Sequence, residues 1–268
     1  MKGHRPRKRF GQHFLADPGV VDQLVDAIDP QPDDLIVEIG PGPGVLTQRL
    51  VDCCRHLHVV ELDRDLAARL RSRFAGAPGI TVHEGDALRF DFAALGHELR
   101  IVGNLPYNIS TPLLFHLLEQ RASIADMHFM LQKEVVERMA AAPGSRQYGR
   151  LGIMLGCCFA TEPLFDVGPS AFEPPPKVTS TVARLRPLGP DEPAVEDMKL
   201  LSDLVAAAFS QRRKTLRNAL GRFFDTGQLE ALGIDPALRP ENLAVADWIR
   251  LGNALATSAD RQLPNPLE

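Results

Sequence analysis

The sequence predicts an α/β fold with a mostly parallel sheet covered by helices on both faces, followed by a small all-α domain. Short apolar runs alternate with helix-length segments from about residue 18 to residue 185, as in parallel strands joined by crossover helices. The segment PLGPDEP (187–193) is typical of a linker, and beyond it the periodicity is only helical. We therefore expect an α/β domain with a basic N-terminal arm at residues 1–190 and a helical domain at residues 191–268.

The first predicted element is a helix that begins at Pro18. Asp17 is a typical N-cap, and proline is favoured at the first helical position. The apolar residues that follow recur at helical spacing: Val20, Val21, Leu24, Val25 and Ile28.

Five apolar runs predict the buried strands: LIVEI (35–39), LHVVEL (57–62), ITVHEG (80–85), LRIVGN (99–104) and DMHFML (126–131). Helix-length segments lie between them, around residues 45–55, 64–75, 111–121 and 133–142. Two later runs, around 155–162 and 178–185, are expected to extend the sheet. The alternation in VTSTVARL is that of an edge strand.

The C-terminal region contains three segments with apolar stripes at three- and four-residue spacing, which predict helices: VEDMKLLSDLVAAAF (195–209), RRKTLRNALGRFF (212–224) and ENLAVADWIRLGNAL (241–255).

The composition is that of a soluble globular protein, with 44% apolar and 24% charged residues. No run approaches the roughly 18 to 20 apolar residues that cross a membrane. The N-terminal MKGHRPRKRF has no apolar core behind its charges, unlike a secretory signal, so we expect a cytoplasmic protein without a membrane partner. The cysteines, in the adjacent pairs Cys53–Cys54 and Cys157–Cys158, lack metal-ligand spacing, so we expect reduced thiols and no metal.

The net charge of −4 is unevenly distributed. Residues 1–10 and 211–222 each carry five basic residues and no acid, so the remaining 246 residues carry a charge of −14. An acidic body with two concentrated basic segments indicates local contact with a polyanion. The alternative is a solvated tail and a solvated helix face.

A glycine-rich loop, EIGPGPGVL (38–46), follows the first predicted strand. Gly40 and Gly42 allow a sharp turn and the close approach of a ligand to the backbone. Glu61 ends the second strand, where an acid can accept hydrogen bonds from two ribose hydroxyls, and Asp86 follows the third, where it can accept from an adenine amino group. Because ligands of open α/β sheets bind at the carboxyl ends of the strands, these residues predict a nucleoside site.

The nucleoside is best matched by S-adenosylmethionine. The dinucleotide fingerprint G-x-G-x-x-G needs a third glycine where Val45 stands. Glu38, just before the loop, would repel a pyrophosphate, whereas it suits a cofactor with cationic sulfonium and ammonium groups. A nicotinamide or flavin dinucleotide, or a purely structural turn, are the alternatives.

The stretch GNLPYN (103–108) ends the fourth predicted strand at the same edge of the sheet. An exocyclic adenine amine is a weak nucleophile because its lone pair is delocalised into the ring. Two acceptors on its hydrogens favour a pyramidal nitrogen: the Asn104 side-chain oxygen and a backbone carbonyl of the Leu105–Pro106 turn. Tyr107 offers a face on which the base can stack. The alternative is an ordinary strand-ending turn.

The target base must leave any stack to reach this pocket, and a second aromatic residue could cover its other face. Phe172, in SAFEPPPKVTS, is our candidate, with core packing as the alternative.

Eight motifs span nearly the whole chain: RKRFGQHFL (7–15), VEIGPGPGVLT (37–47), VVELDRDLA (59–67), GDAL (85–88), VGNLPYNISTPLL (102–114), MLQKEVVERM (130–139), FEPPPKVTS (172–180) and FSQRRKTLRNAL (209–220). In these motifs the chain resembles the small-subunit ribosomal RNA adenine dimethyltransferases. The resemblance implies a class I methyltransferase fold (Rossmann-like, seven-stranded) and a helical C-terminal domain. It also implies two methyl groups placed on each of two adjacent adenines, in a hairpin near the 3′ end of 16S rRNA, during maturation of the 30S subunit, with S-adenosylhomocysteine as the product.

The resemblance also implies cofactor contacts at six positions: His13, Leu15, Gly40, Glu61, Asp86 and Asn104. The family often has asparagine where this chain has His13, so a side-chain contact and a backbone contact both stay open there. The basic residues expected to hold rRNA phosphates are Arg7, Lys8 and Arg9 in the arm, and Arg212, Arg213, Lys214 and Arg217 along one helix. We expect a monomer.

Three alternatives remain. The 23S rRNA adenine methyltransferases of macrolide resistance share the catalytic logic, although the motifs at 172–180 and 209–220 favour the small-subunit enzyme. An assembly or RNA-binding factor can keep this fold without catalysis, but the intact Asn104-Leu105-Pro106-Tyr107 favours an enzyme. The third alternative is a dinucleotide-dependent oxidoreductase.

Overall fold

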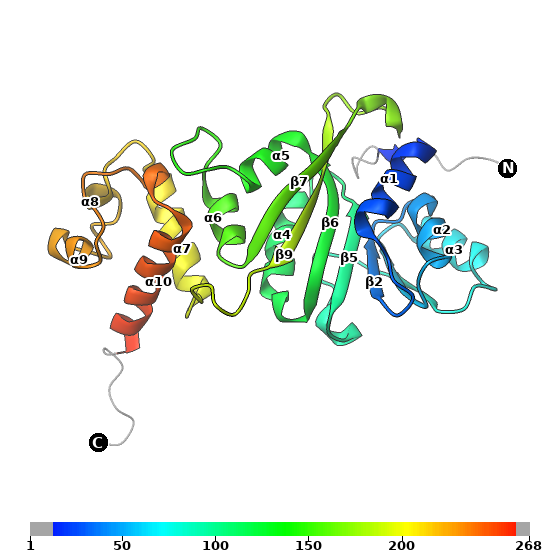
Figure 1. Cartoon of the computed structure of the whole chain (residues 1–268), viewed down its shortest axis with the longest axis horizontal. Coiled ribbons are helices and arrows are strands. Elements are labelled where there is room, and N and C mark those ends of the chain that lie inside the picture. Colours follow the sequence, from blue (N-terminus) through cyan, green and yellow to red (C-terminus); the bar gives the residue numbers. More distant parts are fainter. Residues whose placement is uncertain (1–12, 261–268) are drawn as a thin grey trace, which may run out of the picture. The chain divides into compact units, whose positions relative to one another are not determined.

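The computed structural model describes residues 13–260, which form two compact units (Figure 1). The first unit extends to Val136 and also includes Ala160–Pro187, and the second comprises Glu137–Phe159 and the chain from Leu188 onward. The structure adds a feature that the sequence did not indicate. Residues 137–159 pack with the C-terminal helices, and the buried Tyr148 hydroxyl donates a hydrogen bond to the backbone oxygen of Leu243 at 2.7 Å.

The first unit is built on a seven-stranded sheet in the order β4-β3-β2-β5-β6-β9-β7. The strands are β2 (Leu35–Ile39), β3 (His56–Glu61), β4 (Ile80–Glu84), β5 (Leu99–Asn104), β6 (Ile124–Gln132), β7 (Phe159–Val167) and β9 (Ser180–Pro187). Strands β2 to β6 pair in parallel, and β9 is antiparallel to β6. The strands predicted at 35–39, 57–62, 80–85, 99–104, 126–131 and 178–185 are confirmed to within two residues at each end, whereas the strand expected around 155–162 is found at Phe159–Val167.

The prediction that residues 178–185 form an edge strand is wrong, since β9 lies between β6 and β7. The two polar residues that begin β9 do not face water. The hydroxyl of Thr181 donates to Asp166 on β7 at 2.6 Å, and the hydroxyl of Ser180 bonds the Tyr107 hydroxyl at 2.8 Å. These side chains are buried with partners, so their polarity does not indicate exposure to water.

The helices of the first unit are α1 (Pro18–Ile28), α2 (Val45–Val51), α3 (Arg64–Arg73) and α4 (Ser110–Glu119), and α5 (Lys133–Met139) begins in it. The Asp17 N-cap is confirmed, because its carboxylate accepts from the backbone of Gly19 and Val20 at 2.8 and 3.3 Å. The second unit contains α6 (Arg150–Gly156), α7 (Met198–Ser210), α8 (Leu216–Ala219), α9 (Thr226–Ala231) and α10 (Val245–Asp260). Short 3-10 turns occur at Ala93–Leu95, Arg121–Ser123, Pro169–Ala171 and Pro240–Asn242. None of the helices among residues 13–260 has the length and apolar character needed to span a bilayer.

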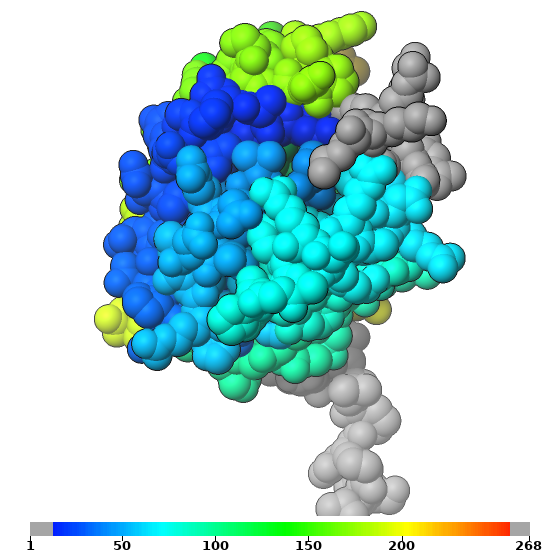
Figure 2. Space-filling view, turned by 90° about the vertical axis from the view of Figure 1, so that its right-hand side faces the viewer, coloured from blue at the N-terminus to red at the C-terminus, as the bar shows by residue number. Residues whose placement is uncertain are grey.

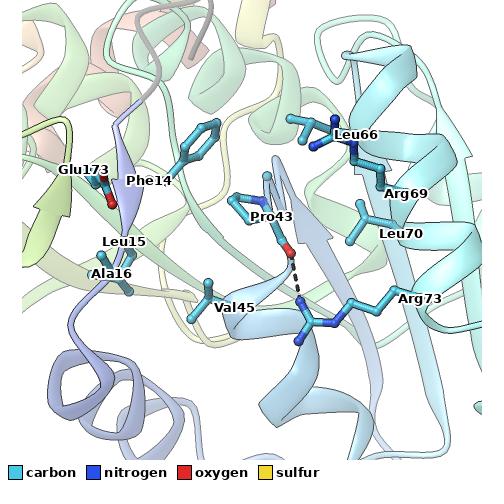
Figure 3. Close-up of a pocket in the computed structure, with 11 residues that line it drawn as sticks. Phe14, Leu15, Ala16, Pro43, Val45, Leu66, Arg69, Leu70, Arg73 and Glu173 are labelled. Carbon is cyan, nitrogen blue, oxygen red and sulfur yellow. Dashed lines mark hydrogen bonds between the residues drawn. The ribbon is translucent and has the colours of Figure 1, made fainter. Parts of the chain in front are cut away.

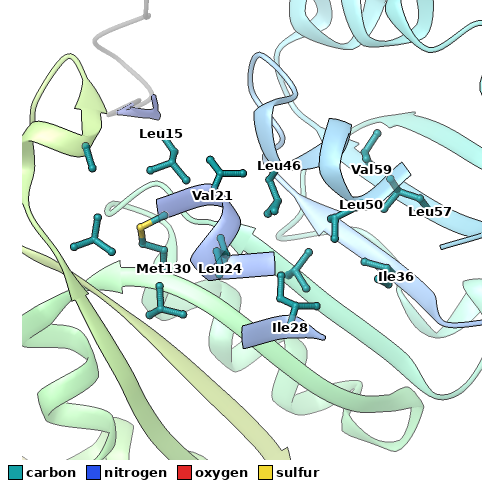
Figure 4. Packing of buried hydrophobic residues seen from close by; sticks show 14 of the residues in the cluster. Leu15, Val21, Leu24, Ile28, Ile36, Leu46, Leu50, Leu57, Val59 and Met130 are labelled. Carbon is teal, nitrogen blue, oxygen red and sulfur yellow. The ribbon is translucent and has the colours of Figure 1, made fainter. Parts of the chain in front are cut away.

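The hydrophobic core of the first unit lies between α1, α2 and one face of the sheet (Figure 4). Leu24 and Ile28 of α1 and Leu50 of α2 pack with Ile36 of β2 and Leu57 of β3, and each is at most 1% exposed. Burial of each such side chain contributes about 1.5–3 kcal/mol. This packing joins α1 and α2 to the strands that precede the loops of the site.

A two-stranded sheet joins the start of the described chain to a distant loop. Strand β1 (Phe14–Leu15) pairs antiparallel with β8 (Phe172–Glu173), and the backbone nitrogens of Ala16 and Asp17 donate to the oxygen of Ala171 at 2.8 and 3.2 Å. The sequence did not predict this pairing. It fixes residues 13–17 beside the glycine-rich loop.

The prediction that residues 212–224 form one helix is wrong. Helix α7 ends at Ser210, and only α8 (Leu216–Ala219) is helical in the basic segment. Thr215 is extended (φ −68°, ψ 159°), and the backbone nitrogen of Leu216 donates to the oxygen of Leu238 at 2.7 Å. Tertiary hydrogen bonds to the loop before α10 therefore replace the first helical turns.

Gly103→Ala will destabilise the protein, because a β-carbon at Gly103 would lie 2.5 Å from the backbone oxygen of Ile39 on the neighbouring strand. We expect a loss of about 1–3 kcal/mol in the free energy of unfolding, measured by urea denaturation. Gly85→Ala is the matched control, since its β-carbon would meet nothing within 4 Å, and it should change stability by less than about 0.5 kcal/mol. Equal stabilities of the two variants would contradict the close approach of β2 and β5.

Candidate active site

Two adjacent cavities lie at the carboxyl edge of β2, β3, β4 and β5. The smaller, of about 60 Å³, is lined by His13, Phe14, Gly40, Gly42, Glu61, Asn104, Leu105, Pro106 and Tyr107. The larger, of about 170 Å³, is lined by Ile39, Gly40, Val60, Glu61, Leu62, Asp63, Gly85, Asp86, Ala87, Leu88, Pro106, Asn108 and Ile109. Gly40, Glu61 and Pro106 line both. We call the smaller one the transfer cavity and the larger one the nucleoside cavity. Most of the catalytic and cofactor-binding residues predicted from the sequence meet here.

Gly42 shows why the loop needs glycine. Its φ is +57°, and a β-carbon there would lie 2.9 Å from the ring of Phe14. Substitution would therefore strain the backbone and displace the ring that covers the loop.

Glu61 is a buried carboxylate placed between the two cavities. It is 4% exposed, and its two oxygens accept from the backbone nitrogens of Gly42 at 3.1 Å and Asp63 at 2.8 Å. Burial raises the pKa of Glu61, and these hydrogen bonds oppose the rise. The contacts hold the carboxylate where it can accept from a hydroxyl in either cavity.

Asp86 lines the nucleoside cavity and follows β4. One of its carboxylate oxygens accepts from the backbone nitrogen of Leu88 at 3.0 Å, which fixes the side chain in a local turn. The position fits the role predicted for it, an acceptor for an amino group.

Glu38 lies behind the loop, away from these cavities. It is 2% exposed, accepts from the Thr47 hydroxyl at 2.6 Å, and lines neither the transfer cavity nor the nucleoside cavity. Burial raises the pKa of Glu38 to about 8, and the nearby Glu61 adds to the rise. Its contact with a cationic cofactor stays a prediction.

Asn104 is held in one orientation by the N-terminal segment. Its Nδ2 donates to the backbone oxygen of His13 at 3.0 Å. Because a carbonyl oxygen only accepts, the amide nitrogen must point to His13 and the amide oxygen away from it. That oxygen has no hydrogen-bond partner among residues 13–260, and the side chain lines the transfer cavity. It is an acceptor available to a ligand.

The proline turn supplies a second acceptor. The backbone oxygen of Pro106 accepts from the Ile109 nitrogen and the Ser110 hydroxyl, both at 3.1 Å, so it is already satisfied. The oxygen of Leu105 receives no hydrogen bond from the residues that the structure describes. The sequence left open which carbonyl of the turn could serve, and the hydrogen bonding favours that of Leu105.

Tyr107 and His13 stack at the transfer cavity. Their ring centroids are 5.7 Å apart with an interplanar angle of 30°, and the Tyr107 hydroxyl bonds the Ser180 hydroxyl at 2.8 Å. Burial raises the pKa of Tyr107, so the phenol is neutral. The Nδ1 of His13 lies 2.7 Å from the oxygen of Pro174 and donates to it. Both the ring and the backbone of His13 therefore lie at the cavity, and the sequence did not identify its ring as a partner of Tyr107.

Phe172 and Leu15 lie in the hydrophobic core instead of the transfer cavity. They face each other in the β1–β8 pair and are 4% and 7% exposed. Phe172 lines neither cavity, so its position supports the core-packing alternative that the sequence left open. A contact of Leu15 with the cofactor stays a prediction.

The predicted rRNA-binding residues differ in their surroundings. Arg7, Lys8 and Arg9 lie outside the described residues. Arg212 pairs with Glu241 and donates to the backbone oxygens of Ser145 and Arg146, so it serves the packing of the second unit. Arg213, Lys214 and Arg217 are exposed. Among residues 13–260, no group of three or more His, Cys, Asp or Glu side chains is arranged to hold a metal ion.

Known proteins are similar to this chain over most of its length. A family described as "Ribosomal RNA adenine dimethylase" matches residues 3–257. A protein of Aromatoleum aromaticum named "Ribosomal RNA small subunit methyltransferase A" is 56% identical over 265 residues, which cover 99% of this chain and 100% of the relative. A protein of the same name from Thiobacillus denitrificans is 58% identical over 254 residues, which cover 95% and 99% of the two chains.

Two solved structures are similar over most of the chain. A dimethyladenosine transferase from Plasmodium falciparum superposes with a TM-score of 0.79 at 27% identity, covering 92% of this chain and 98% of that one. The 23S rRNA methyltransferase ErmE superposes with a TM-score of 0.71 at 26% identity, covering 91% and 99%.

The stability of the protein will fall with rising pH because of Glu38. The folded state keeps the Glu38 proton up to about pH 8, whereas the ordinary pKa is 4.5, so the unfolded chain releases it earlier. Stability from this group is complete below about pH 4.5 and is lost as pH rises toward 8, by a few kcal/mol, since one pKa unit is worth about 1.4 kcal/mol. Glu38→Gln should lose much less unfolding free energy between about pH 5 and pH 8 in urea titrations. Parallel pH profiles for wild type and variant would refute this role.

Proposed function

The chain belongs to the ribosomal RNA adenine dimethylase family, and we propose the specific reaction that it catalyses. It is an S-adenosylmethionine-dependent methyltransferase that acts on two adjacent adenines in a hairpin near the 3′ end of 16S rRNA. Each exocyclic amine receives two methyl groups, and the substrate is the immature 30S subunit. The observation that carries the proposal is the pair of unfilled acceptors, the Asn104 amide oxygen and the Leu105 carbonyl, beside the glycine-rich loop.

The residues present fit S-adenosylmethionine. Glu61 offers a buried carboxylate to ribose hydroxyls, and Asp86 offers a fixed acceptor to the adenine amino group in the nucleoside cavity. Gly40 leaves the backbone bare beside both cavities, since a β-carbon there would meet only Pro106, at 3.9 Å. When bound, the cofactor supplies an electrophilic methyl group. The chain's own part is to hold the nucleoside and to expose one side of it to the transfer cavity.

The same residues prepare the target amine. Asn104 and Leu105 accept its two hydrogens, which disfavours the planar amine and frees the lone pair. The hydrogen bond to His13 aligns the Asn104 oxygen before the substrate arrives, so little reorganisation is needed. The Tyr107 ring provides the stacking face that holds the extruded base.

The small-subunit substrate is favoured over 23S rRNA by the degree of similarity. The relatives named for the small subunit are 56% and 58% identical to this chain, whereas ErmE is 26% identical. A non-catalytic assembly factor is disfavoured by the available acceptors of Asn104 and Leu105. Monomeric state, cytoplasmic location and independence of metal stay predictions of the sequence.

Transfer of radiolabelled methyl groups onto unmethylated 30S subunits tests the proposed function directly. We expect label on two adjacent adenines of the 16S 3′ hairpin, mapped by primer extension, and none on protein-free 23S rRNA. Label on 23S rRNA alone would favour the alternative substrate, and no label on either would favour the assembly factor.

Asn104→Ala will lower kcat for methyl transfer by about 100-fold or more, because it removes one acceptor of the amine hydrogens. Binding to unmethylated 30S subunits should be retained, as measured by co-sedimentation. Asn104→Asp is the informative companion, since it keeps an acceptor but cannot donate to the His13 carbonyl. It should recover only part of the activity. Unchanged turnover in Asn104→Ala would refute the catalytic role.

The exposed basic residues of the second unit will affect substrate binding and not folding. Arg213→Ala and Lys214→Ala should each raise KM for 30S subunits and reduce the slope of log affinity against log salt by about 1. Arg212→Ala should instead lower Tm, because it removes the pair with Glu241. An unchanged salt slope in the first two variants would exclude phosphate contacts by these residues.

A further inference from the structure

A third cavity, of about 460 Å³, lies between β1, the glycine-rich loop, α3 and β8 (Figure 3). Figure 2 shows the face of the first unit that carries α2 and α3. Phe14 and Gly42 form the wall that it shares with the transfer cavity. Its volume is within the range of about 300–1,000 Å³ that is typical of ligand pockets. Of the expected cofactor contacts, Gly40, Glu61, Asp86 and Asn104 line only the other two cavities, whereas Leu15 lines this one and Gly42 lines both this one and the transfer cavity. The cavity therefore extends the site beyond the residues used so far.

The walls of the cavity differ in chemistry, as Figure 3 shows. Leu66 and Leu70 of α3, with Pro43 and Val45 of the glycine-rich loop, make an apolar floor. Arg69 and Arg73 of α3 stand on one side. The Glu173 carboxylate stands on the opposite side, on β8.

The two arginines carry charge that no acid in the described chain neutralises. Arg69 is exposed and makes no hydrogen bond or ion pair with a described residue. Arg73 donates only to neutral acceptors, the backbone oxygen of Pro43 at 3.0 Å and the side-chain oxygen of Gln48 at 3.2 Å. By contrast, Arg71 on the same helix is paired with Glu84 at 3.2 Å. Two unneutralised guanidinium groups beside an apolar floor suit a phosphate attached to a base.

We propose that this cavity binds the nucleotide next to the target adenosine. Its base lies on the apolar floor, its phosphate lies at Arg69 and Arg73, and Glu173 accepts from a base amino group. The inference rests on the proposed function, in which the two target adenines are neighbours. When one base occupies the transfer cavity, the next is a single phosphodiester away, and only the Phe14–Gly42 wall separates the two cavities.

Removal of the cation tests the phosphate contact. Arg69→Gln should raise KM for unmethylated 30S subunits about tenfold and weaken its salt dependence. The affinity for S-adenosylmethionine, measured by calorimetry, should be unchanged. Arg64→Gln is the matched control, because Arg64 is an exposed arginine on the same helix that does not line the cavity. Equal KM values for the two variants would overturn the proposal.

Filling the cavity tests the base contact. Ala16 is exposed and lines the cavity, and Ala16→Trp keeps its backbone hydrogen bond to Ala171. We would compare 30S subunits that carry both adenines with subunits in which one or the other is replaced by uracil, and measure initial rates per remaining adenine. Wild type should lose about tenfold in kcat/KM on the uracil substrates, since stacking of a purine is lost. The Ala16→Trp variant should methylate all three substrates slowly and at similar rates.

The remaining outcomes overturn the proposal in identifiable ways. If Ala16→Trp weakens S-adenosylmethionine binding, the cavity belongs to the cofactor. If it lowers Tm and leaves KM unchanged, residues of the chain itself fill the cavity. If wild type methylates all three substrates equally well, the neighbouring base has no site. If wild type methylates none of them, the proposed function fails, and this inference fails with it.

Discussion

The chemistry of the site depends on one hydrogen bond, from the Asn104 side chain to the backbone oxygen of His13. This contact decides which end of the amide faces the transfer cavity, and an amide turned the other way would offer hydrogens to an amine that needs acceptors. His13 is held in turn by the β1–β8 pair and by its ring contacts with Pro174 and Tyr107. A carbonyl from the start of the described chain thus sets the catalytic orientation of a side chain at the end of a central strand.

The parallel sheet makes this arrangement possible. Strands β2 and β5 are neighbours, so the glycine-rich loop and the Asn104 turn leave the sheet side by side. Gly103 permits the close approach of these strands, and Gly42 permits the Phe14 ring to lie against the loop. The same ring then separates the transfer cavity from the cavity assigned to the neighbouring nucleotide. Gly103 and Gly42 therefore shape the separate cavities at this edge of the sheet.

Local patterns predicted the strands, the Asp17 cap and the residues at the sheet edge, because these depend on periodicity and on residue chemistry near in sequence. Features set by contacts between distant residues were not predictable in the same way. The edge assignment of residues 178–185 failed because the partners of Ser180 and Thr181 are Tyr107 and Asp166. The helix expected at residues 212–224 is mostly replaced by contacts with residues near Leu238. Arg69 and Arg73 were not predicted as site residues, because acids nearby in the sequence offset their charge. Only the packing of α3 shows that they line a cavity.

The site offers acceptors to the amine in place of a catalytic base, and the chemistry of the substrate explains why. An exocyclic adenine amine is already unprotonated at neutral pH, so no proton has to be removed from it before the attack. Its weakness as a nucleophile comes from delocalisation of the lone pair, which neutral acceptors on both hydrogens oppose. Glu61, the carboxylate that lines the transfer cavity, is occupied by two backbone nitrogens and is placed for hydroxyl groups. A proton is in excess only after the new carbon–nitrogen bond has formed, and it can then leave to water. The transfer cavity therefore needs fixed dipoles more than a titrating group, and the Asn104–Leu105 turn provides them.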